Sequence, residues 1–478
     1  MSSHQIPYVL EISAPADTAA VFRQLVKHPK CVFFDSSLRH HQLGRYSFLS
    51  CDPLVWYVAD TDAEARRAWH DLQAMWSELQ ADNVPGLPPF QGGIAGLFGY
   101  ELGRLFERIP IAAHDELRVP LCAVGLYDVI VAFDHDTSQA WIISQGWPET
   151  SAAARFERAV ERAEQFSRWL AAPVGSPDSL PSMTAGKSPR IAAIESPHFL
   201  VQPARNTYSN FTADGYRQAV RRAIEYIRAG DVFQVNLSQR LMRPATIDTH
   251  LLYLQMRQRT QATFGGYLDA GSFQLASLSP ERFVSVRDRV VEARPIKGTR
   301  QRMSRAEADL YAADELQSSA KDRSENVMIV DLLRNDLSRV CIDDSVMVQQ
   351  LCGLETYGYV QHLVSSVRGR LRPECTPWQV MEAAFPGGSV TGAPKVRAME
   401  VISQLEQVAR GAYCGSLGYI GTDGSADMSI LIRTLTAKDG WWHFPVGGGI
   451  VADSDPQHEY EETWHKATGI LQGIDGKR

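Results

Sequence analysis

The sequence has no long hydrophobic run. Its 478 residues are 44% apolar, yet the longest uninterrupted apolar stretches, such as residues 129–133, are no longer than a strand. A helix that crosses a membrane needs about 20 apolar residues. The first residues also lack the basic segment and apolar stretch of a secretory signal. We therefore expect a cytoplasmic protein.

Several binding classes are disfavoured by what is missing. The seven cysteines are scattered, odd in number and form no Cys-x-x-Cys pair, which is typical of reduced, partly buried thiols. A formal charge of −7 with dispersed basic residues argues against nucleic acid as a partner. The glycine-rich segment 385–395 fails as a phosphate loop, because Ala393 and Pro394 stand where Lys and Ser or Thr are needed. We expect this segment to shape a small-molecule pocket instead.

Composition and periodicity divide the chain into two halves. We expect an N-terminal region over residues 1–170, a linker rich in Ala, Pro, Ser and Gly over 171–204, and a C-terminal core over 205–478. In the N-terminal region, helical spacing predicts two helices and apolar stretches predict three strands. The predicted helices are 69–79 and 156–170, and the predicted strands are 93–98, 126–133 and 141–144.

The C-terminal core alternates hairpins with helices. Thr212 is placed to cap a helix that ends at Gly230, and four turn signals predict hairpins. The turns are residues 269–271, 287–289, 422–424 and 438–440, and further helices are predicted over 305–319 and 321–337. Hairpins between helix pairs indicate an α+β fold with antiparallel sheets covered by helices.

Lys297 stands in a turn of unusual composition, Pro-Ile-Lys-Gly-Thr. Pro295 restricts the backbone before the lysine, and Gly298 permits a positive φ just after it. The amine is therefore held on a stiff segment. Such a lysine is either a positioned nucleophile or a surface residue that completes a tight turn, and the turn alone leaves both alternatives open.

Two further charged residues have two readings each. Glu281 opens a strand that a hairpin connects to the strand leading to Lys297, so it is either an acid beside that amine or the partner of Arg282 or Arg294 in a salt bridge. Arg433 follows three apolar residues on a predicted strand. It is either a satisfied core ion pair or a clamp for a substrate carboxylate.

Three glutamates form a candidate metal site. Glu459, Glu462 and Lys466 recur at spacings of three and four on a predicted helix, residues 456–471, and therefore share one face. Glu325 shares a helix face with apolar residues and needs a partner, a proton or a metal. Such oxygen ligands suit Mg²⁺. The alternatives are a solvated salt-bridging stripe and ion pairs of Glu325 with neighbouring basic residues.

An ordered set of motifs gives the chain a family resemblance. The motifs are residues 229–238 (Ala-Gly-Asp-Val-Phe-Gln-Val-Asn-Leu-Ser), 279–283 (Ser-Pro-Glu-Arg-Phe), 295–299, 328–336 (Met-Ile-Val-Asp-Leu-Leu-Arg-Asn-Asp), 391–395 (Thr-Gly-Ala-Pro-Lys) and 447–451 (Gly-Gly-Gly-Ile-Val). This set resembles the chorismate-utilising enzymes. The similarity runs from about Tyr208 to the C-terminus and continues more weakly through residues 34–36, 44–47 and 92–93.

The resemblance implies a fold and a site. The fold is a large α/β sandwich with two central antiparallel sheets flanked by helices, onto which the N-terminal segment packs. Glu325 and Glu462 would hold Mg²⁺, with Glu459 as a third ligand or just outside the ligand shell, and the metal would bridge to the ring carboxylate of chorismate. The implied substrate contacts are Gly447, Gly448, Gly449 and Lys466 for that carboxylate, Tyr413 and Arg433 for the enolpyruvyl carboxylate, and Thr391 and His362 for the pocket lining.

Two positions indicate the branch of the family. Isochorismate and salicylate synthases carry a water-activating lysine where this chain has Gln234, and anthranilate synthases carry alanine where it has Lys297. Lysine at this position is similar to component 1 of the aminodeoxychorismate synthases. The resemblance therefore implies a transferase reaction in which Lys297 attacks C2 of chorismate while Glu281 protonates the departing C4 hydroxyl. Ammonia then adds at C4 and expels the lysine, which yields 4-amino-4-deoxychorismate for para-aminobenzoate and folate synthesis.

The resemblance also implies partners and leaves alternatives. The chain lacks a Gly-x-Cys-x-Gly nucleophile elbow, so we expect ammonia to come from a separate glutamine amidotransferase subunit. Anthranilate formation with pyruvate release is one alternative, and a non-catalytic regulatory subunit is another. The family's tryptophan site would include Ser36 and Arg45. Residues 33–36 read Phe-Phe-Asp-Ser instead of Leu-Leu-Glu-Ser, which leaves an inhibitory and a purely structural tryptophan as alternatives.

Overall fold

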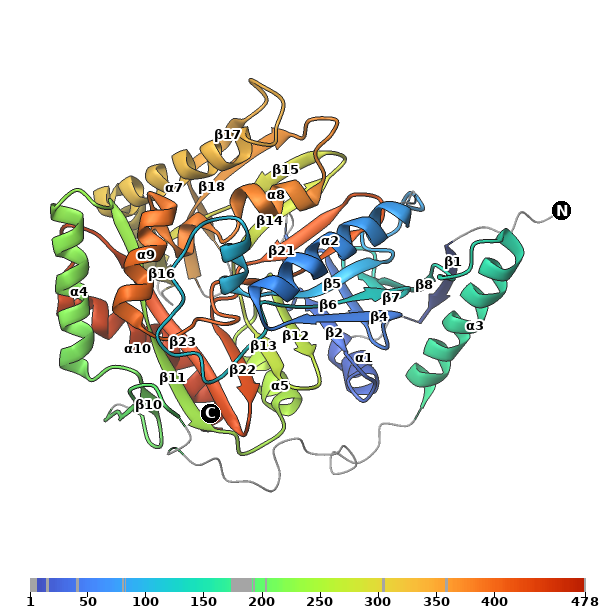
Figure 1. The fold of residues 1–478 in the computed structure, drawn as a ribbon, viewed down its shortest axis with the longest axis horizontal. Helices are drawn as coiled ribbons and strands as arrows, with labels where there is room; N and C mark the ends of the chain where they lie inside the picture. Colours follow the sequence, from blue (N-terminus) through green and yellow to red (C-terminus); the bar gives the residue numbers. More distant parts are fainter. Residues whose placement is uncertain are drawn as a thin grey trace.

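Two antiparallel sheets form the centre of the molecule, and helices cover their outer faces (Figure 1). The computed structural model describes residues 7–13, 17–39, 43–79, 81, 83–172, 191, 194–202, 204–302, 306–356 and 360–476. Aromatic and aliphatic side chains of both sheets meet in a buried layer that includes Phe48, Phe90, Tyr127 and Tyr419. The expected α+β sandwich is confirmed.

The first sheet has 13 strands. Across the sheet they are β1 (Tyr8–Ile12), β8 (Gln139–Ser144), β7 (Val129–Asp134), β3 (Tyr46–Ser50), β2 (Val32–Asp35), β12 (Gly265–Asp269), β13 (Gln274–Ser277), β22 (Thr434–Lys438), β23 (Trp441–Ile450), β11 (Gln234–Pro244), β10 (Tyr208–Ser209) and β9 (Phe199–Leu200), with β19 (Gly392–Ala393) on β11. Helices α1 (Thr18–Leu25), α3 (Ala152–Ala171), α4 (Ala213–Arg228), α5 (Thr249–Arg259), α9 (Lys395–Glu406) and α10 (Pro456–Ile474) pack against it.

The second sheet has 10 strands. They are β16 (Ile296–Gln301), β18 (Val360–Arg370), β15 (Val290–Ala293), β14 (Arg282–Arg287), β21 (Ala426–Ser429), β20 (Ser416–Gly421), β5 (Gly93–Phe98), β6 (Cys122–Tyr127) and β4 (Val55–Ala59), with β17 (Met347–Thr356) on β18. Helices α2 (Asp62–Glu78), α6 (Ala306–Ser318), α7 (Ala320–Ser338) and α8 (Pro377–Ala384) accompany it. Two short 3₁₀ turns, η1 (Tyr100–Leu105) and η4 (Gly388–Val390), complete the elements that matter below.

Both halves of the chain contribute to both sheets. Strand β2 pairs with β12, and β5 pairs with β20. Most of the predicted linker lies outside the described residues, but Ser196 is buried and donates a hydrogen bond to Glu116, which also pairs with Arg240 of β11. The ion pair of Glu116 with Arg240 joins the two halves, and the hydrogen bond from Ser196 attaches the end of the linker segment to it.

Most local predictions are confirmed, and one strand is corrected. Thr212 accepts a hydrogen bond from the N–H of Gly215 at the start of α4, and all four predicted turns join paired strands. Residues 126–133 are not a single strand, because the chain leaves the second sheet at Tyr127 and enters the first at Val129. Asp128 at this crossing is buried and paired with Arg162.

The remaining sequence-level expectations concern thiols and membranes. Each of the seven cysteines is buried and carries a free thiol, as expected from their scattered spacing. Among the described residues, no helix is both long enough and apolar enough to cross a membrane.

Candidate active site

The predicted site residues converge where the two sheets are covered by α7 and α10. Strands β11 and β23 of the first sheet form one wall, and their register places Leu237 opposite Gly448 and Asn236 opposite Gly449. Strands β16 and β18 of the second sheet pair with each other and carry Lys297 and His362, and α7 packs on both strands. Turn η4 packs against α7 and β19 and closes one end. The site is therefore assembled from segments more than 200 residues apart.

Lys297 and Glu281 meet through Ser389. Lys297 lies at a β-bulge of β16, where Gly298 has a φ of 73°. Its ammonium donates to the carbonyl oxygen of Ser389 at 3.2 Å, and the Ser389 hydroxyl donates to Oε1 of Glu281 at 2.7 Å. One residue thus contacts both the amine and the carboxyl group. The bulge re-aims the lysine towards the site instead of along the strand.

Glu281 has the environment of an acid. It is only 4% exposed, and burial raises its pKa while the Ser389 hydroxyl and Lys297 act in the opposite direction. The alternative salt bridges do not form, since Arg282 pairs with Asp427 at 2.8 Å and Arg294 pairs with Glu355. A buried carboxyl with a raised pKa retains its proton at higher pH than an ordinary glutamic acid and is suited to proton donation.

Ser389 is the functional residue that the sequence reasoning missed. It lies in segment 385–395, which we assigned to a pocket and in which we named only Thr391. The backbone turn η4 presents its carbonyl and hydroxyl in one direction. The only sequence signal was a hydroxyl residue within a glycine-rich loop, and that pattern is too common to select one position.

The three candidate metal ligands lie on α7 and α10, close to two ammonium groups. Glu462 pairs with Lys466 at 2.6 Å, and Glu459 accepts a hydrogen bond from Ser454 and lies 3.5 Å from Lys321. Among the described residues, no three His, Cys, Asp or Glu side chains already converge with metal-ligand geometry. Of the predicted salt-bridging stripe, the pair of Glu462 with Lys466 forms along α10, whereas Glu459 pairs with Lys321 of α7.

Burial and nearby ammonium groups act on the pKa of each of these carboxyl groups. Burial raises the pKa of Glu325, against the charges of Lys297 and Lys321. Burial also raises the pKa of Glu459, against its hydrogen bond from Ser454. For Glu462 burial acts upward as well, but the hydrogen bond from Lys466 and the charges of Lys466, Lys321 and Lys297 together lower the pKa. Carboxyl groups whose enclosure disfavours their charge gain from a bound cation, which fits a Mg²⁺ donor set.

The three glycines of β23 permit close approach. A Cβ atom on Gly448 would lie 3.4 Å from oxygens of both Glu459 and Glu462, and one on Gly449 would lie 2.1 Å from Nε2 of Gln234. Lys466 donates to the carbonyl of Gly447 at 2.8 Å. This stretch of strand therefore offers backbone, not side chains, to a ligand beside the carboxylates.

Arg433 lies in a bend and not on a strand, which corrects the prediction. The bend, where φ is 50°, carries the chain from β21 of the second sheet to β22 of the first. Burial lowers the pKa of Arg433, with Glu281 opposing, and no described residue forms a hydrogen bond or ion pair with its guanidinium. Of the two readings, the geometry favours a clamp for an incoming carboxylate over a satisfied core ion pair.

The other predicted pocket residues are buried around this point. Burial and the charge of Arg433 lower the pKa of His362 to about 4, so its imidazole is neutral at neutral pH. Tyr413 lies under the guanidinium of Arg410, and the Thr391 hydroxyl donates to the carbonyl of Gly387. Thr391 therefore holds the loop as well as lining the site.

Gln234 is buried with an unused acceptor. It is 1% exposed at the start of β11, and its Oε1 has no hydrogen-bond partner among the described residues. A buried acceptor of this kind calls for a donor from a ligand or water.

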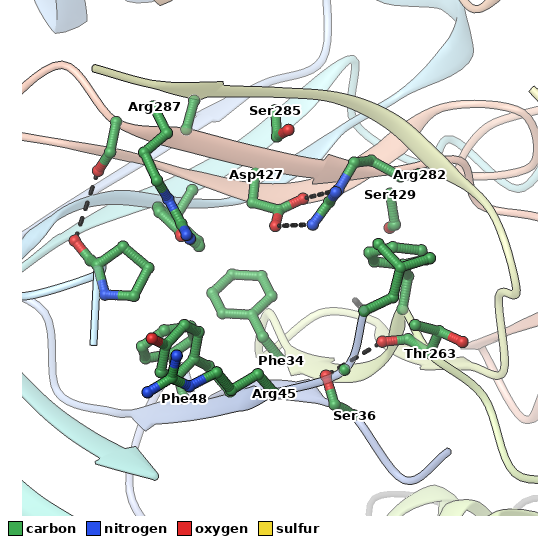
Figure 2. A pocket seen from close by; sticks show the side chains of 18 of the residues that line it. Phe34, Ser36, Arg45, Phe48, Thr263, Arg282, Ser285, Arg287, Asp427 and Ser429 are labelled. Carbon is green, nitrogen blue, oxygen red and sulfur yellow. Dashed lines mark hydrogen bonds and ion pairs between the residues drawn. The ribbon is translucent and has the colours of Figure 1, made fainter. Parts of the chain in front are cut away.

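A separate cavity lies apart from these residues, between β2 and β3 of one sheet and β14 and β21 of the other (Figure 2). Its volume is about 580 Å³. Ser36 and Arg45 both line it, so the structure brings this predicted pair together; Ser36 donates to the carbonyl of Thr263 at 3.1 Å, and Arg45 pairs with Asp134 at 2.7 Å. Figure 2 shows aromatic rings and the Arg282–Asp427 pair around the same space.

Comparison with known proteins agrees with this geometry. A family model described as chorismate binding enzyme matches residues 30–472. The chain is 36% identical to aminodeoxychorismate synthase component 1 of Escherichia coli (strain K12), over 98% of this chain and 99% of the relative. It is 38% identical to anthranilate synthase component 1 of Thermus thermophilus over 84% and 82%. The crystal structure of anthranilate synthase component I from Streptococcus pneumoniae superposes with a TM-score of 0.73 at 30% identity, covering 89% of this chain and 92% of that one.

Proposed function

This chain belongs to the family of chorismate binding enzymes, and we propose that it is component 1 of an aminodeoxychorismate synthase. Its substrates would be chorismate and ammonia, and its product 4-amino-4-deoxychorismate for para-aminobenzoate and folate synthesis. The observation that carries the proposal is the contact chain from Lys297 through Ser389 to Glu281, an amine and a buried acid bridged by one residue. Similarity over nearly the full chain to proteins named aminodeoxychorismate synthase component 1 supports it.

The first chemical step forms a covalent bond to the enzyme. Lys297, once deprotonated, attacks C2 of chorismate, both ring double bonds shift, and the C4–oxygen bond breaks as Glu281 gives its proton to the departing hydroxyl. Water leaves and the Glu281 carboxylate remains. Burial raises the pKa of Glu281, which favours the protonated form that this step requires.

The second step releases the lysine. Ammonia attacks C4, both double bonds shift back, and the bond from C2 to Lys297 breaks, while a proton from the added nitrogen returns to Glu281. Two conjugate displacements replace one difficult substitution, which is the usual advantage of a covalent intermediate. Arg433, with no described partner for its guanidinium, would hold the enolpyruvyl carboxylate together with Tyr413, and neutral His362 would line the pocket.

We propose Glu325 and Glu462 as Mg²⁺ ligands, with Glu459 as a third ligand or just outside the ligand shell. When bound, the ion would neutralise and orient the ring carboxylate of chorismate. Lys466 and the backbone of Gly447, Gly448 and Gly449, which carry no side chains, would contact the same carboxylate. Gln234 stands where a water-activating base would be needed, and its amide cannot serve as one.

We also propose a partner subunit and a second small-molecule ligand. Relatives are named as component 1, which agrees with a second subunit, and a glutamine amidotransferase would supply ammonia. The cavity lined by Ser36 and Arg45 would take tryptophan, either as an inhibitor or as a structural ligand. Titration of tryptophan against chorismate turnover separates these two roles.

The product decides between this proposal and its main alternative. The purified protein should be incubated with chorismate, MgCl₂ and ammonium chloride, with and without an added 4-amino-4-deoxychorismate lyase. Formation of para-aminobenzoate only with the lyase supports the proposal. Anthranilate and pyruvate without the lyase would establish anthranilate synthase activity instead, which the 38% identity to the Thermus thermophilus protein favours as the second candidate.

Variants test the covalent step and the regulatory alternative together. With ammonium withheld, mass spectrometry should find a chorismate-derived adduct on Lys297. Lys297→Ala should abolish both adduct and product, whereas Lys438→Ala, at an exposed hairpin position, should retain both. Full turnover by Lys297→Ala would contradict the covalent route, and a complete lack of turnover by the wild-type protein would favour a regulatory subunit.

A further inference from the structure

A small recess lies behind the wall of the active site. It is bounded by η1, by loop residues 109–112, by α9 and by Arg410, and its volume is about 30 Å³. This volume holds one or two molecules the size of water and excludes chorismate. The recess therefore selects by size for a very small ligand.

Arg410 separates the recess from the active site. Its guanidinium lies 5.5 Å from the ring centroid of Tyr413 and donates to the carbonyl oxygens of Val390 at 3.0 Å and Asn236 at 2.8 Å. Val390 follows Ser389, which contacts both Lys297 and Glu281. Arg410 therefore lines the recess and also contacts the backbone next to the residue that holds the reacting groups.

The polar groups of the recess include two that are suited to a small cation. Among the residues that the structure describes, Glu101 accepts hydrogen bonds from the backbone N–H groups of Arg410 at 2.8 Å and Gly411 at 2.9 Å and from no side chain. The hydroxyl of Tyr100 has no hydrogen-bond partner among the described residues, although Tyr100 is buried and only 6% exposed. Both arginines that line the recess are neutralised, Arg104 by Asp62 at 2.8 Å and Arg410 by Glu406 at 2.6 Å.

We propose that this recess is the inlet for the nitrogen substrate: ammonium binds between Glu101 and Tyr100 and passes into the active site as neutral ammonia. The inference rests on the proposed amination, because ammonia is a substrate of that reaction.

Glu101 accepts the proton that ammonium loses in the inlet. Ammonium gives one proton to the Glu101 carboxylate, ammonia moves inward past Arg410, and the carboxyl group later releases the proton through the recess to solvent. Enclosure raises the pKa of Glu101 to about 7, with the Arg410 backbone N–H and Arg104 opposing and Asp115 adding to the effect. A group that titrates near neutral pH both accepts and releases a proton readily.

The test measures ammonium kinetics with the full chain at saturating chorismate, with ammonium chloride as the only nitrogen source. We expect Glu101→Gln to raise the KM for ammonium at least tenfold and to leave the KM for chorismate unchanged. Formation of the Lys297 adduct without ammonium should also be unchanged, because that step precedes nitrogen addition. Glu107→Gln, six residues along and outside the recess, is the matched control and should behave as wild type.

A second variant keeps the inference testable if Glu101→Gln does not fold. Ser403→Leu, on the α9 side of the recess, adds two heavy atoms, enough to fill a space of about 30 Å³, and should lower kcat/KM for ammonium at least tenfold with normal adduct formation. Unchanged ammonium kinetics in Ser403→Leu would overturn the inlet. A wild-type protein that forms neither adduct nor aminated product would instead overturn the proposed function and leave no role for an inlet.

Discussion

Replacing Glu281 with glutamine tests the proposed acid with the least structural disturbance. Glutamine has the same shape, and its carbonyl can still accept the hydrogen bond from Ser389 that Glu281 accepts at 2.7 Å. It cannot give a proton to the departing C4 hydroxyl. General acids typically contribute about 10²–10⁴ in rate, which corresponds to roughly 3–5 kcal/mol of barrier. We expect kcat to fall by about that factor.

The assay should follow both turnover and adduct formation. Proton donation and attack by Lys297 belong to the same step, so the rate of adduct formation should fall by the same factor as kcat. Burial raises the pKa of Glu281, so wild-type activity should decline only as pH rises through this raised value, and that alkaline decline should disappear in Glu281→Gln. Glu400→Gln, at a half-buried ion pair with Arg397 on α9, is the control and should remain near wild type.

Turnover of Glu281→Gln within about tenfold of wild type would refute the assignment. The loss of a general acid should lower the rate by about a hundredfold or more. A variant that forms adduct at the normal rate but fails to release product would also contradict it. In that case Glu281 would act only in the second step, as the acceptor of the proton from the added nitrogen.

Three further predictions concern Ser389, Gly449 and the proposed Mg²⁺ ligands. Ser389→Ala removes the hydroxyl that stabilises the Glu281 carboxylate, so the alkaline decline in kcat should move to higher pH, and Ser389→Thr should restore it. Gly449→Ala places a Cβ atom 2.1 Å from Nε2 of Gln234, and the KM for chorismate should rise about tenfold or more, as overpacking usually costs about 1–3 kcal/mol. Mg²⁺ at a hundred times its Kd should stabilise the wild-type protein by about 2.7 kcal/mol in a thermal-shift assay, and Glu462→Gln should lose most of this gain.

Local features of the fold could be predicted because their causes are local. The Thr212 cap and the four hairpin turns depend on residues a few positions apart, and all of them form. The crossing at Asp128 could not be predicted. Two adjacent apolar strands read as one long strand, and only the buried pair of Asp128 with Arg162 marks where the chain changes sheets.

The candidate site shows the same division. Lys297 and Glu281 were identified together because one hairpin connects their strands, which is a short-range relation. Arg433 was placed on a strand although it lies in a bend, because the chain there changes sheets, and a sequence pattern does not reveal a change of sheet. Ser389 went unrecognised since its role depends on facing two residues about 100 positions away.

The sequence by itself determined the family, the antiparallel α+β class and the residue types available for chemistry, because these depend on ordered motifs and on periodicity along the chain. Only the tertiary structure decided which alternatives hold: that Glu281 faces Ser389 and not an arginine, that the Arg433 guanidinium has no described partner, and that Arg410 separates a small recess from the reacting groups. The physical reason is that burial and charge pairing are set by neighbours brought together from distant strands, and these neighbours fix both the pKa of an acid and the partner of a cation.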